Sequence, residues 1–359
     1  MRFAFFGSSL VSAYWNGACT YYRGIVRALD ARGHRVTFYE PDAFERQAHR
    51  DIADPGWAEV VVYDPSEETA VRELVGDAAA GADVLVKASG VGVCDAVLEE
   101  AVAEDEDAAL RIFWDVDAPA TLASMEADAD SPLRGLIDRF DLVLTYGGGR
   151  PVVDRYGALG ARACVPVYNA LDPSTHHPAP SRPELACDLA FLGNRLPDRE
   201  ARVEEFFFGA VAALPERSFL LGGNGWEERV EGLDNLRYLG HVAPGDHNAL
   251  NRSALAVLNV SRESMAANGW SPATRVFEAA GAGACLISDE WAGIEEFLAP
   301  GEEVLVARDG AEVAGLLADL EPERAERIGE AARERVLAEH TYDRRAAQVE
   351  AVLEGVPAA

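Results

Sequence analysis

Short apolar runs alternate with amphipathic stretches along nearly the whole chain, and this alternation limits the possible folds more than any other feature. In the first half the apolar runs are "RFAFFG", "RVTFYE", "EVVVYD", "DVLVKA", "RIFWDV", "DLVLTY" and "ACVPVY". Helical patterns such as "ACTYYRGIVRALDARGH" lie between several of them. Strands and helices in alternation predict a parallel sheet that is covered by helices on both faces.

The alternation breaks once and then restarts. Residues 168–186, "YNALDPSTHHPAPSRPELA", have several prolines and no periodicity, which is typical of a linker. Beyond them the runs "DLAFLGN", "SFLLGG", "LRYLGH", "ALAVLNVS", "ACLISD" and "EVLVAR" repeat the first arrangement. The sequence therefore predicts an α/β protein of two tandem Rossmann-like doubly wound domains that face each other across a cleft. The expected domains are 1–170 and 171–340, with a closing helix in 341–359, and ligands are expected beyond the carboxyl ends of the strands.

Composition excludes several classes of function. The chain has 32 basic and 61 acidic residues and a formal net charge of −29, which argues against nucleic-acid and anionic-membrane partners. No apolar run reaches the length of about 18 residues that a membrane span needs. The five cysteines are widely spaced and include no CxxC pair, so free thiols in a reducing cytoplasm are expected rather than disulfides or a zinc site. The first residues are interpreted as a strand and not as a targeting segment.

The stretch "SPATRVFEAAGAGACLIS", residues 271–288, combines a helix of small residues with a following strand. Ser271 suits the N-cap and Pro272 the first helical position, so a helix is predicted from 271 to about 282. A helix start presents unpaired N–H groups and is a site for anions. Arg275 and Glu278 lie on one face, where they would serve a phosphate and a ribose diol. The alternative is an ordinary surface ion pair between residues i and i+3.

Three further segments carry a resemblance to a known family. They are "NALDPSTHHP", "RVFEAAGAGACLISDEWAGIEEFLAPGEEVLVARD" and "HTYDRRAAQVEAVL". They resemble the hinge, the donor-binding segment and the closing helix of GT-B glycosyltransferases. The similarity is to the group that includes glycosyltransferase family 4 and, more closely, the CgeB-like spore-maturation proteins. It covers most of the chain and is strongest over residues 187–310. It implies that the closing helix packs back on the first domain.

The resemblance also implies a donor site for a nucleoside-diphosphate sugar. Glu278 would hold the ribose hydroxyls, and Arg199 falls where the family often has a phosphate-binding lysine. The family 4 pattern has a second glutamate eight residues before the first, and here that position is Trp270. The donor-binding residues expected from the motifs and the helix start are Gly17, Gly193, Arg195, Arg199, Gly240, His241, Arg262, Ser271, Thr274, Arg275 and Glu278.

The resemblance further implies a retaining, metal-independent sugar transfer. The residues expected to act in it are Asp117, Arg199 and Arg275. Asp117 lies near the position of the family's frequent catalytic histidine, although it is equally suited to cap a helix, and Asp115 is its neighbour in the motif. No metal site is expected, and no cofactor besides the nucleotide sugar as co-substrate. The acceptor is left open between a glycan, a small molecule and a protein.

Alternatives to a transferase remain at this point. A sugar-nucleotide epimerase or hydrolase on the same fold would use Asp115 and Asp117 as an acid/base pair. A non-catalytic nucleotide-sugar-binding protein would fit the replacement by Trp270. A nicotinamide-dependent dehydrogenase is disfavoured because neither "GSSLVS" nor "GNRLPD" gives the GxGxxG pattern. Lys87 is interpreted as a structural lysine that snorkels, and His176 and His177 as solvated linker residues.

Overall fold

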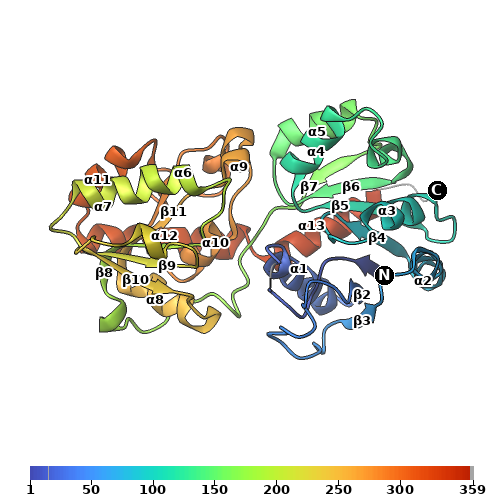
Figure 1. Ribbon diagram of the computed structural model, residues 1–359, viewed down its shortest axis with the longest axis horizontal. Helices are drawn as coiled ribbons and strands as arrows, with labels where there is room; N and C mark the ends of the chain where they lie inside the picture. Colours follow the sequence, from blue (N-terminus) through green and yellow to red (C-terminus); the bar gives the residue numbers. More distant parts are fainter. Residues whose placement is uncertain (15, 356–359) are drawn as a thin grey trace. The chain divides into compact units, whose positions relative to one another are not determined.

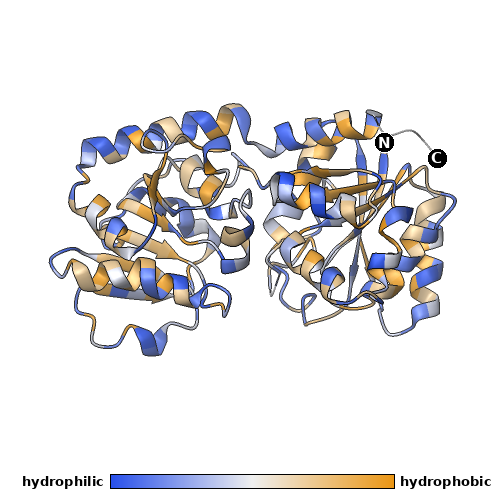
Figure 2. Ribbon diagram, turned by 90° about the horizontal axis from the view of Figure 1, so that it is seen from above, coloured by the Kyte–Doolittle hydropathy of each residue, from blue (hydrophilic) through white to orange (hydrophobic). Residues whose placement is uncertain are grey.

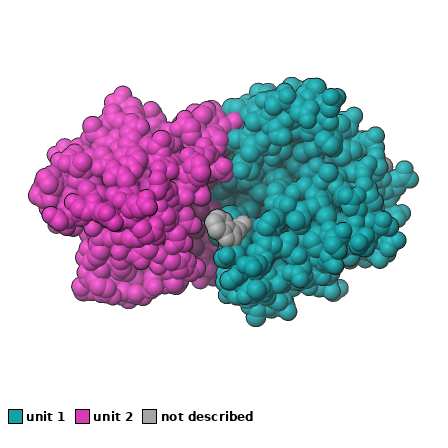
Figure 3. All heavy atoms as spheres, in the orientation of Figure 1, with its two compact units in different colours: residues 1–169, 342–359 teal, residues 170–341 magenta. Residues whose placement is uncertain are grey.

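A computed structural model describes residues 1–14 and 16–355 of the chain. It divides into two compact units (Figure 3). Unit 1 comprises Met1–Asn169 and Tyr342–Ala359, and unit 2 comprises Ala170–Thr341. The sequence placed these divisions at 170/171 and 340/341. Part of the predicted closing segment, residues 356–359, lies outside the described residues.

Unit 1 is built on a seven-stranded parallel sheet of order β3-β2-β1-β4-β5-β6-β7 (Figure 1). The strands are β1 (Arg2–Phe6), β2 (Arg35–Pro41), β3 (Glu59–Tyr63), β4 (Val84–Ala88), β5 (Leu110–Asp115), β6 (Leu142–Thr145) and β7 (Cys164–Pro166). The helices are α1 (Cys19–Ala31), α2 (Glu68–Ala80), α3 (Asp95–Glu104), α4 (Ala118–Ala127), α5 (Gly149–Ala158) and α13 (Tyr342–Gly355).

The central strands of unit 1 are apolar because helices cover both faces of the sheet. All five residues of β4 are buried, and the rings of Phe5 and Phe38 stack with centroids 5.1 Å apart. Lys87 on β4 does not snorkel, because its side chain is 0% exposed. Its ammonium lies 2.7 Å from a carboxylate oxygen of Asp95 and 3.6 Å from one of Glu99. The interpretation of Lys87 as structural therefore stands, but the side chain is paired inside the protein.

Helix α13 returns to unit 1 and lies along α1. Gly24 on α1 makes this close approach possible, since a Cβ there would lie 2.3 Å from the ring of Tyr342. At the other end of the contact, Glu350 pairs with Arg32 at 2.5 Å and with His34 at 2.8 Å. A small residue and two ion pairs thus join segments from opposite ends of the chain.

Unit 2 is built on a six-stranded parallel sheet of order β10-β9-β8-β11-β12-β13. The strands are β8 (Cys187–Leu192), β9 (Phe219–Gly222), β10 (Leu236–Gly240), β11 (Ala254–Asn259), β12 (Leu286–Asp289) and β13 (Leu305–Ala307). The helices are α6 (Glu200–Val203), α7 (Gly209–Ala213), α8 (His247–Ser253), α9 (Glu263–Asn268), α10 (Thr274–Gly281), α11 (Gly310–Ala318) and α12 (Pro322–Glu339). A π-helical turn, Glu204–Phe208, joins α6 to α7.

The two ends of unit 2 lie side by side. The backbone N–H of Leu171 donates to the carbonyl of His340 at 2.8 Å, and Leu171 forms an isolated β-bridge with Thr341. The chain therefore enters and leaves unit 2 at one place.

Both sheets have the order of a doubly wound fold, so the predicted fold class is confirmed. The strand order reverses between β1 and β4 in unit 1 and between β8 and β11 in unit 2, and ligands of such sheets bind at the carboxyl ends of the strands beside that reversal. Several strands are orange along most of their length in Figure 2, whereas the helices mix blue and orange, as amphipathic helices do.

Among the described residues, no helix is both long enough and apolar enough to cross a membrane.

Candidate functional site

Two loops of unit 2 lead away from the point where its strand order reverses. The loop after β8 carries Asp198 and Arg199, and the loop after β11 carries Arg262. Asp198 joins the two loops, because its carboxylate accepts hydrogen bonds from Arg262 Nε at 3.0 Å and from Ser264 Oγ at 2.7 Å. The backbone N–H of Glu263 also donates to the carbonyl of Asp198, at 2.7 Å. The structure thus fixes the predicted Arg199 and Arg262 on one framework, through an aspartate that the sequence did not single out.

Arg199 is held in place by backbone. Its Nη2 donates to the carbonyl of Asn194 at 2.6 Å, and its guanidinium covers Gly193, where a Cβ would lie 2.7 Å from Nη2. Within the described part of the chain, the buried Nε has no hydrogen-bond partner. Burial, and then the positive charges of Arg275 and Arg262, lower the pKa of Arg199 to about 10. Arg199, Arg262 and Arg275 are therefore close enough to repel one another, and the negative charge around Arg199 does not balance this repulsion. Such an excess of positive charge favours the binding of an anion.

Helix α10 begins at Thr274, with Ala273 at the N-cap position. The prediction that Ser271 caps this helix and that Pro272 opens it is wrong. Gly269 and Trp270 both have a positive φ, of 71° and 45°, and turn the chain just before the helix. The hydroxyl of the buried Ser271 donates back to the carbonyl of Gly269 at 2.9 Å instead of accepting from the helix. Thr274 is thus the first helical residue, and the unpaired N–H groups of the first turn belong to residues after Ala273.

Arg275 and Glu278 form the predicted pair on one face of α10. Arg275 Nη1 lies 3.3 Å from Glu278 Oε2, and the side chains are only 15% and 13% exposed. The pair is therefore not an ordinary surface ion pair. Burial by itself would raise the pKa of Glu278, but the positive charge of Arg275 above all lowers that pKa, so the carboxylate is ionised. The buried Arg275 Nε has no hydrogen-bond partner among the described residues.

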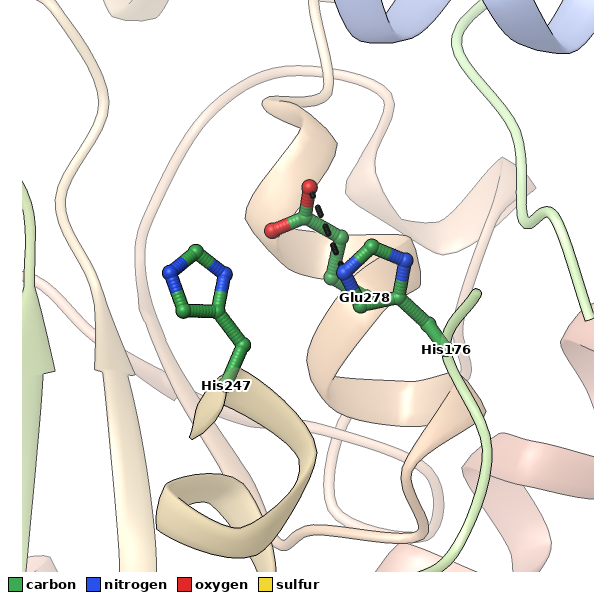
Figure 4. Close-up of side chains that lie close together, drawn as sticks. All are labelled: His176, His247 and Glu278. Carbon is green, nitrogen blue, oxygen red and sulfur yellow. Dashed lines mark ion pairs between the residues drawn. The ribbon is translucent and has the colours of Figure 1, made fainter. Parts of the chain in front are cut away.

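Two histidines lie beside Glu278, and the sequence assigned neither of them to a site (Figure 4). His176 was expected to be solvated, which is wrong: its side chain is 14% exposed and its Nε2 lies 3.8 Å from Glu278 Oε1. His247 is the first residue of α8 and is half-buried. Burial lowers the pKa of both imidazoles and keeps them neutral. His177, next in the chain, is exposed as expected.

The remaining predicted donor residues of unit 2 lie near the ends of β8 and β10. Gly240 ends β10 with a φ of 65°, a conformation that favours glycine, and the exposed His241 follows it. Gly240 also accepts a hydrogen bond from the N–H of Gly223 at 2.7 Å. Arg195 is exposed and is paired with Glu200 at 2.5 Å, so its charge is already matched.

Trp270 occupies the position of the family's second glutamate and fulfils a packing role. Its indole N–H donates to Glu296 at 2.6 Å. Its ring packs closely on Gly293, where an added Cβ would lie only 2.3 Å from the ring. No carboxylate therefore comes from residue 270 itself.

The sequence also missed Asp289, at the end of β12. This fully buried carboxylate lies 2.7 Å from Arg202 and accepts hydrogen bonds from the backbone and hydroxyl of Ser261. It thereby fixes the loop that carries Arg262. Neither periodicity nor a motif identifies such a residue, because its partners come from other parts of the chain.

Gly17 and Asp117, the predicted residues of the first domain, both lie in unit 1. Gly17 is exposed in a turn, and α1 begins two residues later at Cys19. Asp117 is the N-cap position of α4, and its carbonyl accepts from the N–H groups of Ala120 and Thr121. Asp117 is thus at the helix start, as its structural alternative predicted, but its side chain makes no capping hydrogen bond.

Asp115, by contrast, is 0% exposed. Its carboxylate accepts hydrogen bonds from the hydroxyls of Ser89 at 2.7 Å, Thr121 at 2.9 Å and Tyr156 at 2.5 Å. Burial raises its pKa. Asp115 therefore organises the interior of unit 1 and is not accessible to a substrate in this structure.

Comparison with known proteins bears on the fold and on the class of protein. Residues 199–351 match the family model described as glycosyl transferase-like. No curated protein matches the sequence.

Solved structures match over nearly the whole chain. Sucrose-phosphate synthase from Thermosynechococcus elongatus has 14% identity and a TM-score of 0.70, covering 99% of this chain and 98% of its own. Anabaena Alr3699/HepE in complex with UDP-glucose has 14% identity and a TM-score of 0.65, with 99% and 100% covered. Trehalose-6-phosphate from E. coli, bound with UDP-2-fluoro glucose, has 12% identity and a TM-score of 0.70, with 100% of both chains covered.

At these identities the solved structures show the fold, and the family model shows a similarity over residues 199–351. The expectation of a glycosyltransferase-type enzyme is confirmed at that level. The chain has the GT-B fold, and residues 199–351 match a glycosyl transferase-like family model.

Proposed function

We propose that the protein transfers a sugar from a nucleoside-diphosphate sugar to an acceptor, and that unit 2 binds the donor. The observation that carries this proposal is the convergence of Arg199, Arg262 and Arg275 where the strand order of unit 2 reverses, with the ionised Glu278 beside them. A nucleoside diphosphate has both chemistries: phosphates for the arginines and a ribose diol for the carboxylate.

Each residue has a definite role in this proposal. Arg199 and Arg275 bind the diphosphate and stabilise the charge that develops on it as the glycosidic bond breaks. Charge-assisted hydrogen bonds of this kind contribute about 1.5–3 kcal/mol each. Arg262, held by Asp198, assists them, and Glu278 accepts the ribose hydroxyls. Gly193, Gly240 and His241 border the site through their backbone, and Asp117 contacts the acceptor hydroxyl from unit 1.

The finer points are also proposals. We infer that the transfer is retaining and needs neither a metal ion nor a further cofactor, and that the chain is most similar to CgeB-like proteins. UDP is the first nucleotide to test, because UDP or a UDP sugar is bound in the Anabaena and E. coli structures. The acceptor is a glycan, a small molecule or a protein.

Because all five cysteines are free, we place the protein in the cytoplasm.

An epimerase or hydrolase is less well supported. Such an enzyme was expected to use Asp115 and Asp117 as an acid/base pair, but Asp115 is buried and accepts three side-chain hydroxyl donors. A non-catalytic binding protein would keep the donor site without turnover, so binding and activity must be measured separately.

The decisive experiment is a melting-temperature screen against UDP, GDP, dTDP, ADP and NAD, each with and without magnesium. A ligand that binds only the folded state raises the melting temperature, and the rise grows with the logarithm of its concentration relative to its Kd. We expect one nucleoside diphosphate to act independently of magnesium, and Glu278→Ala to abolish its effect. A response to NAD alone, or to no nucleotide, would refute the donor site. Release of the nucleoside diphosphate from its sugar ester then separates an enzyme from a binding protein.

A further inference from the structure

Three potential metal ligands from separate segments of unit 2 converge on one point. His176 comes from the linker, His247 from the start of α8 and Glu278 from the middle of α10 (Figure 4). One ligand atom of each lies within 4.8 Å of those of the other two. Zn–N and Zn–O bonds of about 2.0–2.2 Å require tetrahedral ligands to be roughly 3.3–3.5 Å apart. Small side-chain rotations would bring all three groups to one ion.

The outer nitrogen of each imidazole is already occupied. His247 Nε2 lies 3.3 Å from the carbonyl of Val242. A carbonyl can only accept, so Nε2 carries the hydrogen and the lone pair is on Nδ1, the nitrogen that faces Glu278 in Figure 4. His176 Nδ1 lies 3.0 Å from the hydroxyl of Thr175, and its Nε2 faces Glu278 Oε1. Metal-binding histidines are held in this way, with one nitrogen on a protein group and the other on the ion.

The two oxygens of the Glu278 carboxylate also face different groups. Arg275 lies beside Oε2 of Glu278, whereas His176 lies beside Oε1. One oxygen therefore remains for an ion while the other is oriented by the guanidinium. The positive charge of Arg275 opposes a second cation, so the site will bind more weakly than a structural zinc site.

We propose that His176, His247 and Glu278 form a binding site for a divalent transition-metal ion, Zn²⁺ above all, which overlaps the nucleotide-sugar site. Two imidazoles, one carboxylate and an open fourth position suit Zn²⁺, whereas Mg²⁺ prefers oxygen ligands. The overlap rests on the proposed function, in which Glu278 holds the ribose. One carboxylate cannot serve the ion and the ribose together. Zinc is therefore an inhibitor that competes with the donor and not a cofactor of the transfer.

The test is a calorimetric titration of the metal-free protein with ZnCl₂ in the absence of nucleotide. We expect one ion per chain, and at least about a tenfold loss of affinity in both His176→Gln and His247→Gln. The matched control is His177→Gln, an exposed histidine of the same linker, which should bind Zn²⁺ like the wild type. MgCl₂ should give no heat of binding. Co²⁺ bound to the wild-type protein should show the intense visible absorption of a tetrahedral site, which needs no variant to fold.

Two results would overturn the site: wild-type affinity in both histidine variants, or no zinc binding by the wild type. The titration is then repeated with saturating UDP, which should weaken zinc binding. A third result would separate the two claims. If the melting temperature shows that UDP binds, yet the affinity for Zn²⁺ is unchanged by UDP, the overlap is wrong while the metal site stands. If UDP binds and Zn²⁺ does not, the metal site is wrong while the proposed function stands.

Discussion

Arg199 lies in an environment that disfavours its own charge until an anion arrives. Burial and two neighbouring arginines lower its pKa to about 10, and its buried Nε has no partner in the described chain. In the free protein its charge therefore contributes little to stability. Groups of this kind, costly to the fold and poised for a ligand, are typical of functional sites.

Arg199→Ala should accordingly separate activity from stability. We expect the rate of donor cleavage or transfer to fall about tenfold to a hundredfold, since one charge-assisted contact to the phosphates is lost. The melting temperature should stay the same or rise, because repulsion from Arg275 and Arg262 is relieved. Arg308→Ala is the control, an exposed arginine of unit 2 that pairs with Glu312 and should change neither quantity. Intact activity with an unchanged melting temperature would refute the role of Arg199.

Gly193→Ala tests the position of the same guanidinium without removing it. The new methyl group would lie 2.7 Å from Arg199 Nη2, so the side chain has to move away from the carbonyl of Asn194. Nucleotide affinity, measured by calorimetry, should fall while the charge of the site is unchanged. Gly245→Ala adds the same methyl group where nothing lies within 4 Å, and should bind nucleotide normally. Equal affinity in the two variants would show that the placement of Arg199 is unimportant.

The sequence predicted those residues of the site that belong to recognisable segments. Arg199, Arg275 and Glu278 follow strands or lie on helices whose patterns are clear, and they do lie together in unit 2. His176 was misjudged because a proline-rich linker has no period from which burial can be inferred. Asp198 and Asp289 were missed because their importance depends on partners that are distant in the sequence. Arg262 lies more than 60 residues from Asp198, and Ser261 lies 28 residues from Asp289.

At the level of elements, the strands and long helices follow from apolar periodicity, whereas helix ends do not. The Ser-Pro pair at 271 and 272 is a typical helix start, yet α10 begins at Thr274. The left-handed turn at Gly269 and Trp270 decides the outcome, because it directs the Ser271 hydroxyl back to Gly269. The local preference of Ser-Pro for a helix start was overridden by this turn, which apolar periodicity does not predict.

The contact between α12 and the turn after α10 offers a test at this scale. Gly329 on α12 is buried, and a Cβ there would lie 2.3 Å from the carbonyl oxygen of Gly283. Gly329→Ala should lower the free energy of unfolding by about 1–3 kcal/mol through overpacking. Gly315→Ala on α11 adds the same methyl group to an exposed position with nothing within 4 Å, and should raise it by up to about 1 kcal/mol. Chemical denaturation measures the free energy of unfolding of both variants. A change of the same sign in the two would contradict the close approach of Gly329 to Gly283.

At the level of the whole molecule, α13 belongs to unit 1 although unit 2 precedes it in the chain. Its buried residues Tyr342, Ala346, Val349 and Leu353 are packed within unit 1. The assembly of unit 1 therefore requires both the first and the last parts of the described chain, whereas unit 2 is continuous.

Ending the chain after Thr341 should consequently weaken one unit alone. Loss of the α13 packing should split thermal unfolding into two calorimetric transitions, with that of unit 1 at the lower temperature. The upper transition should still rise with the nucleotide that stabilises the full chain, because Arg199, Arg275 and Glu278 of the proposed donor site lie in unit 2. Glu350→Gln, which removes only the ion pairs with Arg32 and His34, should cost less than about 1 kcal/mol. A single transition at the original temperature would show that α13 is dispensable.

The chain enters and leaves unit 2 side by side, through the bridge between Leu171 and Thr341. One continuous stretch of sequence, residues 170–341, thus makes up the whole of unit 2, and its two ends meet at a single junction. A genetic exchange with crossovers at those two points would replace unit 2 as one cassette and leave the residues of unit 1 unchanged. If unit 2 binds the donor as proposed, such hybrids would acquire a different donor site by shuffling rather than by stepwise mutation.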